Sequence, residues 1–375
     1  MRVNTKGPYF PPRDGWALAQ PQDCGLDPAA LAGALELAAN VETPWPRSLT
    51  AAMKADPDNN EPPPWNEVLG PTLDRGGPSG LIVRHGYMVG AYGEPDRVEM
   101  TFSIAKSYLS LLTGIALRKG VIRDLDDPVR HYALDDGFES PQNRDITWRH
   151  FLHQSSEWEG TLFSKPDLID RNRQVGSGAD NSAKGTHRDL RAPGDWYEYN
   201  DVRVNRFSLS LMQAFRQPLA AVLREHVMEP IGASDTWAWH PYRNSEVEVD
   251  GVLMPSVPGG AHWGGGIFIH SEDHARVGLL VLNDGVWDGR RLLPEGFVEA
   301  LRTPSPCFDA YGFLWWLNTA RQQYPSAPES SFFAMGAGTH LIWVDPTLDL
   351  VAVFRWIDRS RADDVIAAVM RAIQS

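Results

Sequence analysis

Residues 102–106, Phe-Ser-Ile-Ala-Lys, open the stretch that decides how this chain folds. A run that is apolar on most faces follows from Tyr108 to Leu117, and Lys119-Gly120 then supplies a basic last turn and a C-cap residue. This pattern predicts a buried helix. A lysine three residues after a serine at a helix start lies one turn away on the same face. The sequence therefore predicts that the amine of Lys106 reaches the hydroxyl of Ser103.

This spacing has a chemical meaning, because a serine hydroxyl is a weak nucleophile until a base removes its proton. Ser103-x-x-Lys106 is the only Ser-x-x-Lys in the chain, and it opens a buried helix. The other interpretation of the same residues is a helix cap followed by a surface lysine. Whether Ser103 is a nucleophile or a helix cap therefore has to be judged from the other motifs of the chain.

Strand patterns lie on both sides of this helix in the sequence. Residues 80–84 and 87–92 predict a β-hairpin, and later short apolar runs predict strands at 264–269, 312–317, 340–344 and 350–354, before a closing helix at 361–373. We expect an α/β (α+β) fold of two lobes, with an antiparallel sheet built from both chain ends and flanked by helices. The sheet-containing lobe is residues 1–125 and 255–375. A mainly helical lobe, residues 126–254 with a long loop at 161–192, is inserted, and the active site is expected between the lobes.

A second motif lies about a hundred residues after Ser103, where Pro193-Gly-Asp-Trp-Tyr-Glu-Tyr199 forms a turn before a predicted helix. A nearby ammonium favours the deprotonated form of a tyrosine, so Tyr199 is a candidate general base for Ser103. In the alternative interpretation Tyr197 and Tyr199 are packing residues and Asp201 is the N-cap of the following helix.

A third motif, Gly336-Ala337-Gly338, precedes a strand near the C-terminus. Small residues let a substrate lie against a strand edge, where a backbone N–H can bond a developing oxyanion. Ala337 is the candidate donor, together with the N–H of Ser103. A simple bulge or turn is the alternative interpretation.

Charge and composition exclude several classes of protein. The formal net charge of −13 argues against a nucleic-acid partner, because proteins that bind a phosphate backbone carry a basic face. Cys24 and Cys307 are too few for a disulfide framework or a thiolate metal site, and no nucleotide-binding motif occurs. Neither His262 nor His340 belongs to a spaced metal set. We expect neither a metal nor a cofactor.

The N-terminal residues lack the apolar core of a secretory signal, and no run is long enough to span a bilayer. The expectation from these two observations is a cytoplasmic protein that does not enter a membrane.

Taken together, the order and separation of the three motifs resemble the superfamily of class C β-lactamases, D-peptidases and esterases, which have the penicillin-recognising fold. The resemblance covers about residues 80 to 355, with further similar segments at 124–129, 146–155, 264–267 with 273–278, and 342–346. The last two segments look especially similar to 6-aminohexanoate-dimer hydrolases, the linear-amide branch. The resemblance implies a serine hydrolase in which Lys106 and Tyr199 activate Ser103 and an acyl-enzyme forms.

Two departures from the superfamily pattern bear on activity. The usual Tyr-x-Asn is Tyr199-Asn200-Asp201 here, and a carboxylate near Lys106 favours the charged lysine, which shifts the role of general base towards Tyr199. The Lys-Thr-Gly of β-lactamases and D-alanyl peptidases is replaced by Gly336-Ala337-Gly338. The anchor for a β-lactam or peptide carboxylate is thereby lost.

The expected function is therefore hydrolysis of a small-molecule ester or linear amide through an acyl-enzyme on Ser103. A β-lactamase or D-amino-acid peptidase is one alternative, and a non-catalytic binding protein on the same scaffold is another. High tryptophan content suggests an aromatic cleft, although core packing is the commoner use of this residue. The candidate substrate-binding residues are Asp201, Trp158, Trp196, Trp263, His262, Gly336, Gly338 and His340.

Overall fold

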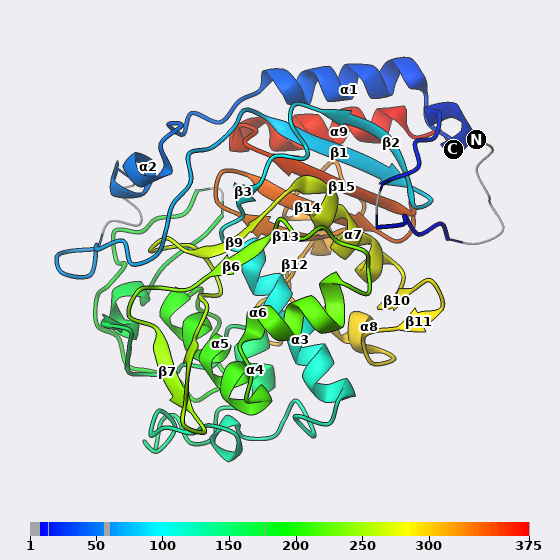
Figure 1. Cartoon of the computed structure of the whole chain (residues 1–375). Coiled ribbons are helices and arrows are strands. Elements are labelled where there is room, and N and C mark those ends of the chain that lie inside the picture. Colours follow the sequence, from blue (N-terminus) through cyan, green and yellow to red (C-terminus); the bar gives the residue numbers. More distant parts are fainter. Residues whose placement is uncertain (1–7, 14, 56–60, 177, 375) are drawn as a thin grey trace.

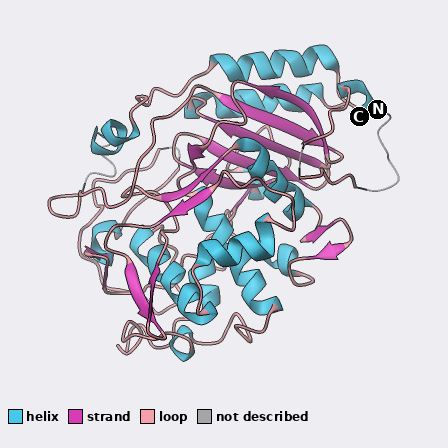
Figure 2. Ribbon diagram, in the orientation of Figure 1, coloured by secondary structure: helices cyan, strands magenta, loops and turns pink. Residues whose placement is uncertain are grey.

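The structure is a computed structural model that describes residues 8–13, 15–55, 61–176 and 178–374. In these ranges the α-helices are α1 (Pro28–Asn40), α2 (Leu49–Ala55), α3 (Ile104–Arg118), α4 (Trp148–Leu152), α5 (Asp201–Phe215), α6 (Leu219–Leu223), α7 (Ser271–Leu282), α8 (Phe297–Leu301) and α9 (Ala362–Ala372). The strands are β1 (Ser79–Arg84), β2 (Tyr87–Tyr92), β3 (Glu99–Met100), β4 (Thr161–Leu162), β5 (Lys165–Pro166), β6 (Ala238–His240), β7 (Glu246–Val249), β8 (Val252–Pro255), β9 (Gly266–Ile269), β10 (Val286–Trp287), β11 (Arg290–Arg291), β12 (Trp316–Leu317), β13 (Phe332–Gly336), β14 (His340–Asp345) and β15 (Leu350–Arg355). Figure 2 shows how these helices and strands are distributed.

The main sheet joins the two ends of the chain, as the sequence predicts. Its strand order is β12-β13-β14-β15-β1-β2, and all neighbouring pairs are antiparallel. β1 lies beside β15 with Leu81 opposite Val353, so the early hairpin extends a sheet made by the late strands. β12 is shorter than the predicted run at 312–317, because Leu314 has a left-handed φ of 58° that interrupts an extended backbone.

Helices cover both faces of this sheet (Figure 1). On one face α1 packs against β2 and α9, and Gly90 of β2 leaves room for the side chains of Leu31 and Leu35. On the other face α7 packs against β14, β15 and β1, with Gly278 close to Ile342 and Val351. The apolar strands are therefore buried from both sides. This arrangement confirms the predicted fold class.

Helix α3 connects the sheet to the helices of the middle of the chain. Residues 104–116 of α3 are buried, as its apolar sequence predicts, and α3 contacts β13 and β14 as well as α5 and α6. Helices α4, α5 and α6 all come from the segment predicted as a helical lobe. The start of α3, with Ser103, consequently lies where the sheet meets these helices.

The long loop expected at 161–192 has little regular structure in its described part, apart from the short strands β4 and β5 and a 3₁₀ turn at Asp167–Asp170. Residue 177 of this loop lies outside the described residues. None of the helices in the described part of the chain combines the length and apolar character needed to cross a membrane.

Candidate active site

Ser103 lies on the turn between β3 and α3. The preceding residue, Phe102, has a left-handed φ of 50°, a conformation that costs a non-glycine residue about 1–3 kcal/mol. Its ring is held edge-on by Trp45 and Trp356, with centroids 5.7 and 6.2 Å away. Ser103 itself is only half-buried, whereas the α3 residues that follow it are buried. The turn thus keeps the serine accessible at the head of a buried helix.

Lys106 brings its amine to this hydroxyl from the first turn of α3. Its Nζ donates to Ser103 Oγ at 3.0 Å and to Asp201 Oδ1 at 2.5 Å. The side chains of Lys106 and Asp201 are only 2% and 4% exposed. A buried ammonium needs a counter-charge, and Asp201 supplies it. The serine and the lysine are therefore placed as their spacing predicts.

Asp201 is available to Lys106 because its neighbour caps the helix. The side chain of Asn200 accepts from the N–H groups of Val202 and Arg203, both at 3.1 Å. The alternative interpretation of Asp201 as the N-cap is wrong for this physical reason: the amide oxygen of Asn200 satisfies those donors, and the Asp201 carboxylate points to the lysine.

The charges of this pair follow from their surroundings. Burial lowers the pKa of Lys106, but the Asp201 carboxylate and then Tyr199 outweigh it, so the pKa is raised above its ordinary value. Burial raises the pKa of Asp201, but the charges of Lys106 and Arg173 hold that pKa well below its usual range. The surroundings of the lysine thus favour its ammonium form.

Tyr199 lies beside the same ammonium, with Lys106 Nζ 4.6 Å from the centroid of its ring. The ring also stacks on Trp316 of β12, at 6.1 Å between centroids. Tyr197 differs: it packs against Phe308 and Tyr311, and burial raises the pKa of its phenol well above the ordinary value. Of the two tyrosines in the turn, Tyr197 is the packing residue and Tyr199 is the one that faces the lysine.

The second oxygen of Asp201 has two further cationic neighbours. Arg173 NH1 is 2.6 Å from Asp201 Oδ2, and His262 Nδ1 is 3.4 Å from it. His262 Nε2 in turn lies 2.6 Å from Glu61 Oε1, which also accepts from Lys184 Nζ at 2.6 Å. The structure thus places His262 between the carboxylates of Asp201 and Glu61.

Three members of this network, Arg173, Glu61 and Lys184, could not be found from the sequence. They come from loops with no motif, and nothing distinguishes them there from ordinary surface charges. In the structure their side chains are buried beside the catalytic candidates.

Glu61, Asp170 and His262 have ligand atoms within 4.8 Å of one another, so their donor set could hold a metal ion. The ammonium of Lys184 pairs with both carboxylates, at 2.6 Å from Glu61 and 3.4 Å from Asp170. Because this lysine already balances the two acids, the residues fit an internal ion-pair cluster better than a metal site.

Gly260 is a further residue of the site that the sequence did not suggest. A Cβ on this glycine would lie 3.0 Å from Lys106 Nζ, 3.1 Å from Asp201 Oδ1 and 3.7 Å from Ser103 Oγ. A side chain here would therefore press on the buried ion pair. Glycine lets the backbone approach the catalytic groups closely.

The predicted oxyanion donors lie next to each other in the fold. Gly336 ends β13 against the start of α3, because a Cβ on it would be 3.4 Å from the N of Ile104 and 2.5 Å from the O of Thr101. Ala337 follows as an exposed residue. Within the described residues, neither the Ser103 N–H nor the Ala337 N–H donates to an acceptor of the protein. Two backbone N–H groups, one at the start of α3 and one directly after β13, are thus without an acceptor among the described residues.

The three predicted substrate-binding tryptophans differ in their burial. Trp158 and Trp263 are core residues, 3% and 2% exposed, whose indole N–H groups donate to Gly137 O and Glu61 Oε2. Trp196 is exposed, with the guanidinium of Arg188 over its ring.

Gly338 and His340 pack against the ring of Trp356. A Cβ on Gly338 would be 2.3 Å from the ring of Trp356, and His340 is fully buried between Phe102 and Trp356. Burial and the nearby Arg355 hold the pKa of His340 well below its ordinary value. It is a neutral core residue and not a substrate contact.

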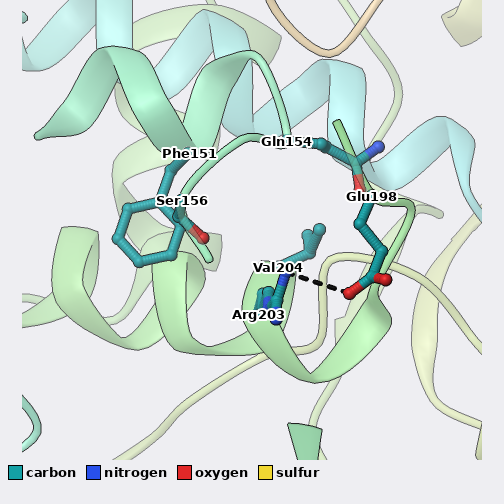
Figure 3. Close-up of a pocket in the computed structure, with 6 residues that line it drawn as sticks. All are labelled: Phe151, Gln154, Ser156, Glu198, Arg203 and Val204. Carbon is teal, nitrogen blue, oxygen red and sulfur yellow. Dashed lines mark ion pairs between the residues drawn. The ribbon is translucent and has the colours of Figure 1, made fainter. Parts of the chain in front are cut away.

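A small cavity is lined by residues from α4 and the segment after it, from the turn before α5 and from α5 itself: Phe151, Gln154, Ser156, Glu198, Arg203 and Val204 (Figure 3). Its volume is about 10 Å³, the space of roughly one water molecule. Glu198 pairs with Arg203 across it, at 3.0 Å. The cavity is too small for an ester or amide and is separate from the accessible hydroxyl of Ser103.

Comparison with known sequences places this geometry in a family. The sequence profile of the Beta-lactamase family matches residues 69–368, which is most of the chain. The chain belongs to the beta-lactamase family. No curated protein sequence matches it significantly. The family name describes descent and fold, and members need not share one substrate.

Solved structures of the beta-lactamase fold include proteins of several activities. EstCE1, a hydrolase with promiscuous acyltransferase activity, has a TM-score of 0.58 at 14% identity, over 92% of this chain and 99% of that one. A penicillin-binding protein homologue from Caulobacter crescentus has a TM-score of 0.57 at 15% identity, over 93% and 99% of the two chains. A protein described as a 6-aminohexanoate-dimer hydrolase, from Bacillus anthracis, has a TM-score of 0.53 at 14% identity, over 98% and 86%. At these identities the similarity shows the fold alone.

Proposed function

We propose that this protein is a serine hydrolase that cleaves a small ester or linear amide through an acyl-enzyme on Ser103. One observation carries the proposal: Ser103 Oγ, half-exposed, lies 3.0 Å from the buried Lys106 Nζ, which also contacts Asp201 and the face of Tyr199. An accessible hydroxyl beside a buried proton-transfer pair is the arrangement that activates a serine nucleophile. A cap with a surface lysine would leave the lysine exposed.

In acylation, Tyr199 acts as a phenolate beside the two cations: Ser103 Oγ attacks the carbonyl carbon, and the proton of Ser103 passes to the Tyr199 oxygen, which becomes a neutral phenol. Because Lys106 is held as an ammonium by Asp201, it contributes its charge and a hydrogen bond, and the tyrosine accepts the proton. The carbonyl oxygen becomes an oxyanion, which accepts from the N–H groups of Ser103 and Ala337. The C–O or C–N bond of the substrate then breaks, and the leaving group takes the proton.

In deacylation, a water molecule attacks the acyl carbon of the ester on Ser103. Its proton passes to the same base and then to Ser103 Oγ as the bond between serine and acyl group breaks. The products are the acid and the free enzyme. The scheme uses these side chains, the two backbone N–H groups and one water molecule.

A preference for esters and linear amides over β-lactams is supported by the strand entrance beside Ser103. Gly336 and Gly338 have no side-chain donor, and Ala337 has only a methyl group. The buried His340 is turned into the core. A substrate carboxylate therefore has no cationic anchor at this position.

The proposal is tested by the variant Ser103→Ala. We expect complete loss of turnover of p-nitrophenyl esters with an unchanged fold, because the side chain of Ser103 makes no capping bond at the start of α3. A fluorophosphonate probe followed by mass spectrometry should label Ser103 in the wild-type protein.

Ser110→Ala is the matched control. Ser110 lies on the same helix, and its buried hydroxyl has no hydrogen-bond partner among the described residues. This variant should keep both turnover and labelling. Labelling of another serine, or turnover by Ser103→Ala, would show that the nucleophile has been wrongly assigned.

A further inference from the structure

We infer that Arg173, on the long loop, is a positioning residue of the unit formed by Ser103, Lys106 and Tyr199. Its proposed role is to act through Asp201 and Tyr199 and to favour the state in which the proton of Ser103 can be accepted. The inference rests on the proposed function and adds a residue to the same site.

Arg173 makes the same two contacts as Lys106. Lys106 Nζ binds Asp201 Oδ1 and lies 4.6 Å from the centroid of the Tyr199 ring. Arg173 NH1 binds Asp201 Oδ2 at 2.6 Å, and its guanidinium carbon lies 5.4 Å from the same centroid. One carboxylate and one aromatic ring thus hold two cations, one from α3 and one from the loop.

Asp170 fixes the arginine in this place. Its Oδ2 lies 3.4 Å from Arg173 NH1 and accepts the backbone N–H of Asp201 at 2.8 Å. The loop and the start of α5 are thereby tied together. The side chain of Arg173 is only 10% exposed. Burial lowers its pKa, but Asp170 and Asp201 outweigh burial and raise the pKa above the ordinary value, so the group is a permanent cation.

The local charge balance gives this cation a function. Once His262 is protonated, the connected cluster holds four cations and three carboxylates: Lys106, Arg173, Lys184 and His262 against Asp201, Asp170 and Glu61. One positive charge is left over in a buried region, where charges interact strongly. It favours negative charge on the phenol oxygen of Tyr199 and on the oxyanion.

Four further titratable groups interact with this cluster. Lys165 interacts with Glu61, and burial lowers the pKa of Lys165 to about 8, so this lysine adds positive charge at neutral pH. Tyr197, Tyr242 and Tyr311 are neutral, because burial raises the pKa values of their phenols. None of these groups offsets the excess positive charge. Removing Arg173 would therefore reduce the excess by one charge.

The test is Arg173→Gln, with kcat/KM for p-nitrophenyl butyrate and the rate of fluorophosphonate labelling of Ser103 both measured from pH 5 to 10. Loss of a neighbouring cation disfavours the deprotonated form of the base. We expect kcat/KM at neutral pH to fall by about tenfold or more, and the rising acid limb of both profiles to move to higher pH. Arg173→Lys keeps the charge and should restore most of the rate and the position of the limb.

Arg171→Gln is the matched control. Arg171 lies on the same loop, is 9% exposed and pairs with Asp167 at 2.8 Å. Guanidinium unfolding of both variants shows how much each loses in stability. An Arg173→Gln protein with the wild-type pH profile, or with no greater loss of rate than Arg171→Gln, would make Arg173 a purely structural ion pair.

Failure of the proposed function would look different from failure of this inference. If the wild type neither hydrolyses esters nor is labelled at Ser103, the serine hydrolase proposal fails and the role of Arg173 falls with it. If the wild type is labelled at Ser103 and Arg173→Gln follows the same pH profile, only the inference about Arg173 is overturned.

Discussion

The carboxylate of Asp201 lies 2.5 Å from the ammonium of Lys106, and both side chains are almost completely buried. Taking two charges out of water is costly, and the mutual attraction of such a pair offsets this cost only while both partners are present. The pair therefore does more than hold two elements together. It sets the charge of Lys106, which contacts Ser103, the proposed nucleophile, and it makes the site sensitive to any change in that charge.

The first prediction concerns stability. Asp201→Ala leaves Lys106 and Arg173 without their shared counter-charge, and we expect a loss of about 3–5 kcal/mol in the free energy of unfolding. Guanidinium denaturation measures it. Asp235→Ala is the control, because Asp235 forms exposed pairs with Arg13 and Arg224 and should cost no more than about 1 kcal/mol. Equal losses in the two variants would mean that the buried ion pair contributes no more to the free energy of unfolding than an exposed pair.

The second prediction is that Lys106 and Tyr199 act as one unit. Both serve a single proton transfer, so the double variant Lys106→Met, Tyr199→Phe should be scarcely slower than the worse single variant. Tyr199→Phe keeps the ring and its stacking on Trp316, so its loss of rate reports on the hydroxyl. Steady-state kinetics on one ester measures all four proteins. Multiplicative losses would show two independent contributions.

The third prediction is a pH dependence of stability that arises from His262. Burial lowers the pKa of His262, but Glu61 and Asp201 outweigh burial and raise the pKa above its ordinary value. A raised pKa contributes stability that is complete below the unfolded value of about 6.5 and is lost as the pH rises through the folded value. The difference in unfolding free energy between the wild type and His262→Gln should therefore shrink above about pH 6.5.

Other histidines do not confuse this measurement. The pKa values of His153 and His274 are lowered by burial, that of His153 to about 4, so they affect stability only below about pH 6.5. Chemical denaturation at several pH values between 6.5 and 8 is the measurement. A difference that stays constant or grows over this range would contradict the assignment of His262 as a cation.

The parts of the site that the sequence predicts are those that local geometry determines. The spacing of Ser103 and Lys106 places them on one helical turn whatever the rest of the chain does. The proposed roles of Tyr199 and of the small residues at 336–338 were supported by the order of these motifs along the chain, which resembles the order in a known superfamily. These positions follow from motifs.

The parts that the sequence does not predict depend on contacts between distant loops. Arg173 and Glu61 lie in irregular segments, and their burial results from long-range packing that no periodicity encodes. Tryptophans serve the core as readily as a cleft, and Trp158 and Trp263 proved to be core residues. Asn200 and Asp201 are both good N-caps, so only the folded structure could show which of them was left to bind Lys106.

The last prediction concerns the substrate, and the structure strengthens the argument from the missing Lys-Thr-Gly. A β-lactam is held partly through its carboxylate, and a charge-assisted hydrogen bond there is worth on the order of 1.5–3 kcal/mol, about ten- to a hundredfold in affinity. His340, which stood close enough in sequence to replace that lysine, is buried and neutral between Phe102 and Trp356. Thr339 remains as the only hydroxyl on this turn.

We therefore expect kcat/KM for p-nitrophenyl butyrate to exceed that for nitrocefin by at least tenfold on the same purified protein. Thr339→Ala tests the remaining donor, because it removes the hydroxyl. The proposed ester reaction does not use this hydroxyl. Any residual nitrocefin hydrolysis should fall in this variant while ester hydrolysis stays unchanged. A wild-type protein that prefers nitrocefin would show that another group anchors the β-lactam carboxylate. Arg173, beside Tyr199, would be the first candidate for that group. The β-lactamase alternative would then replace the esterase proposal.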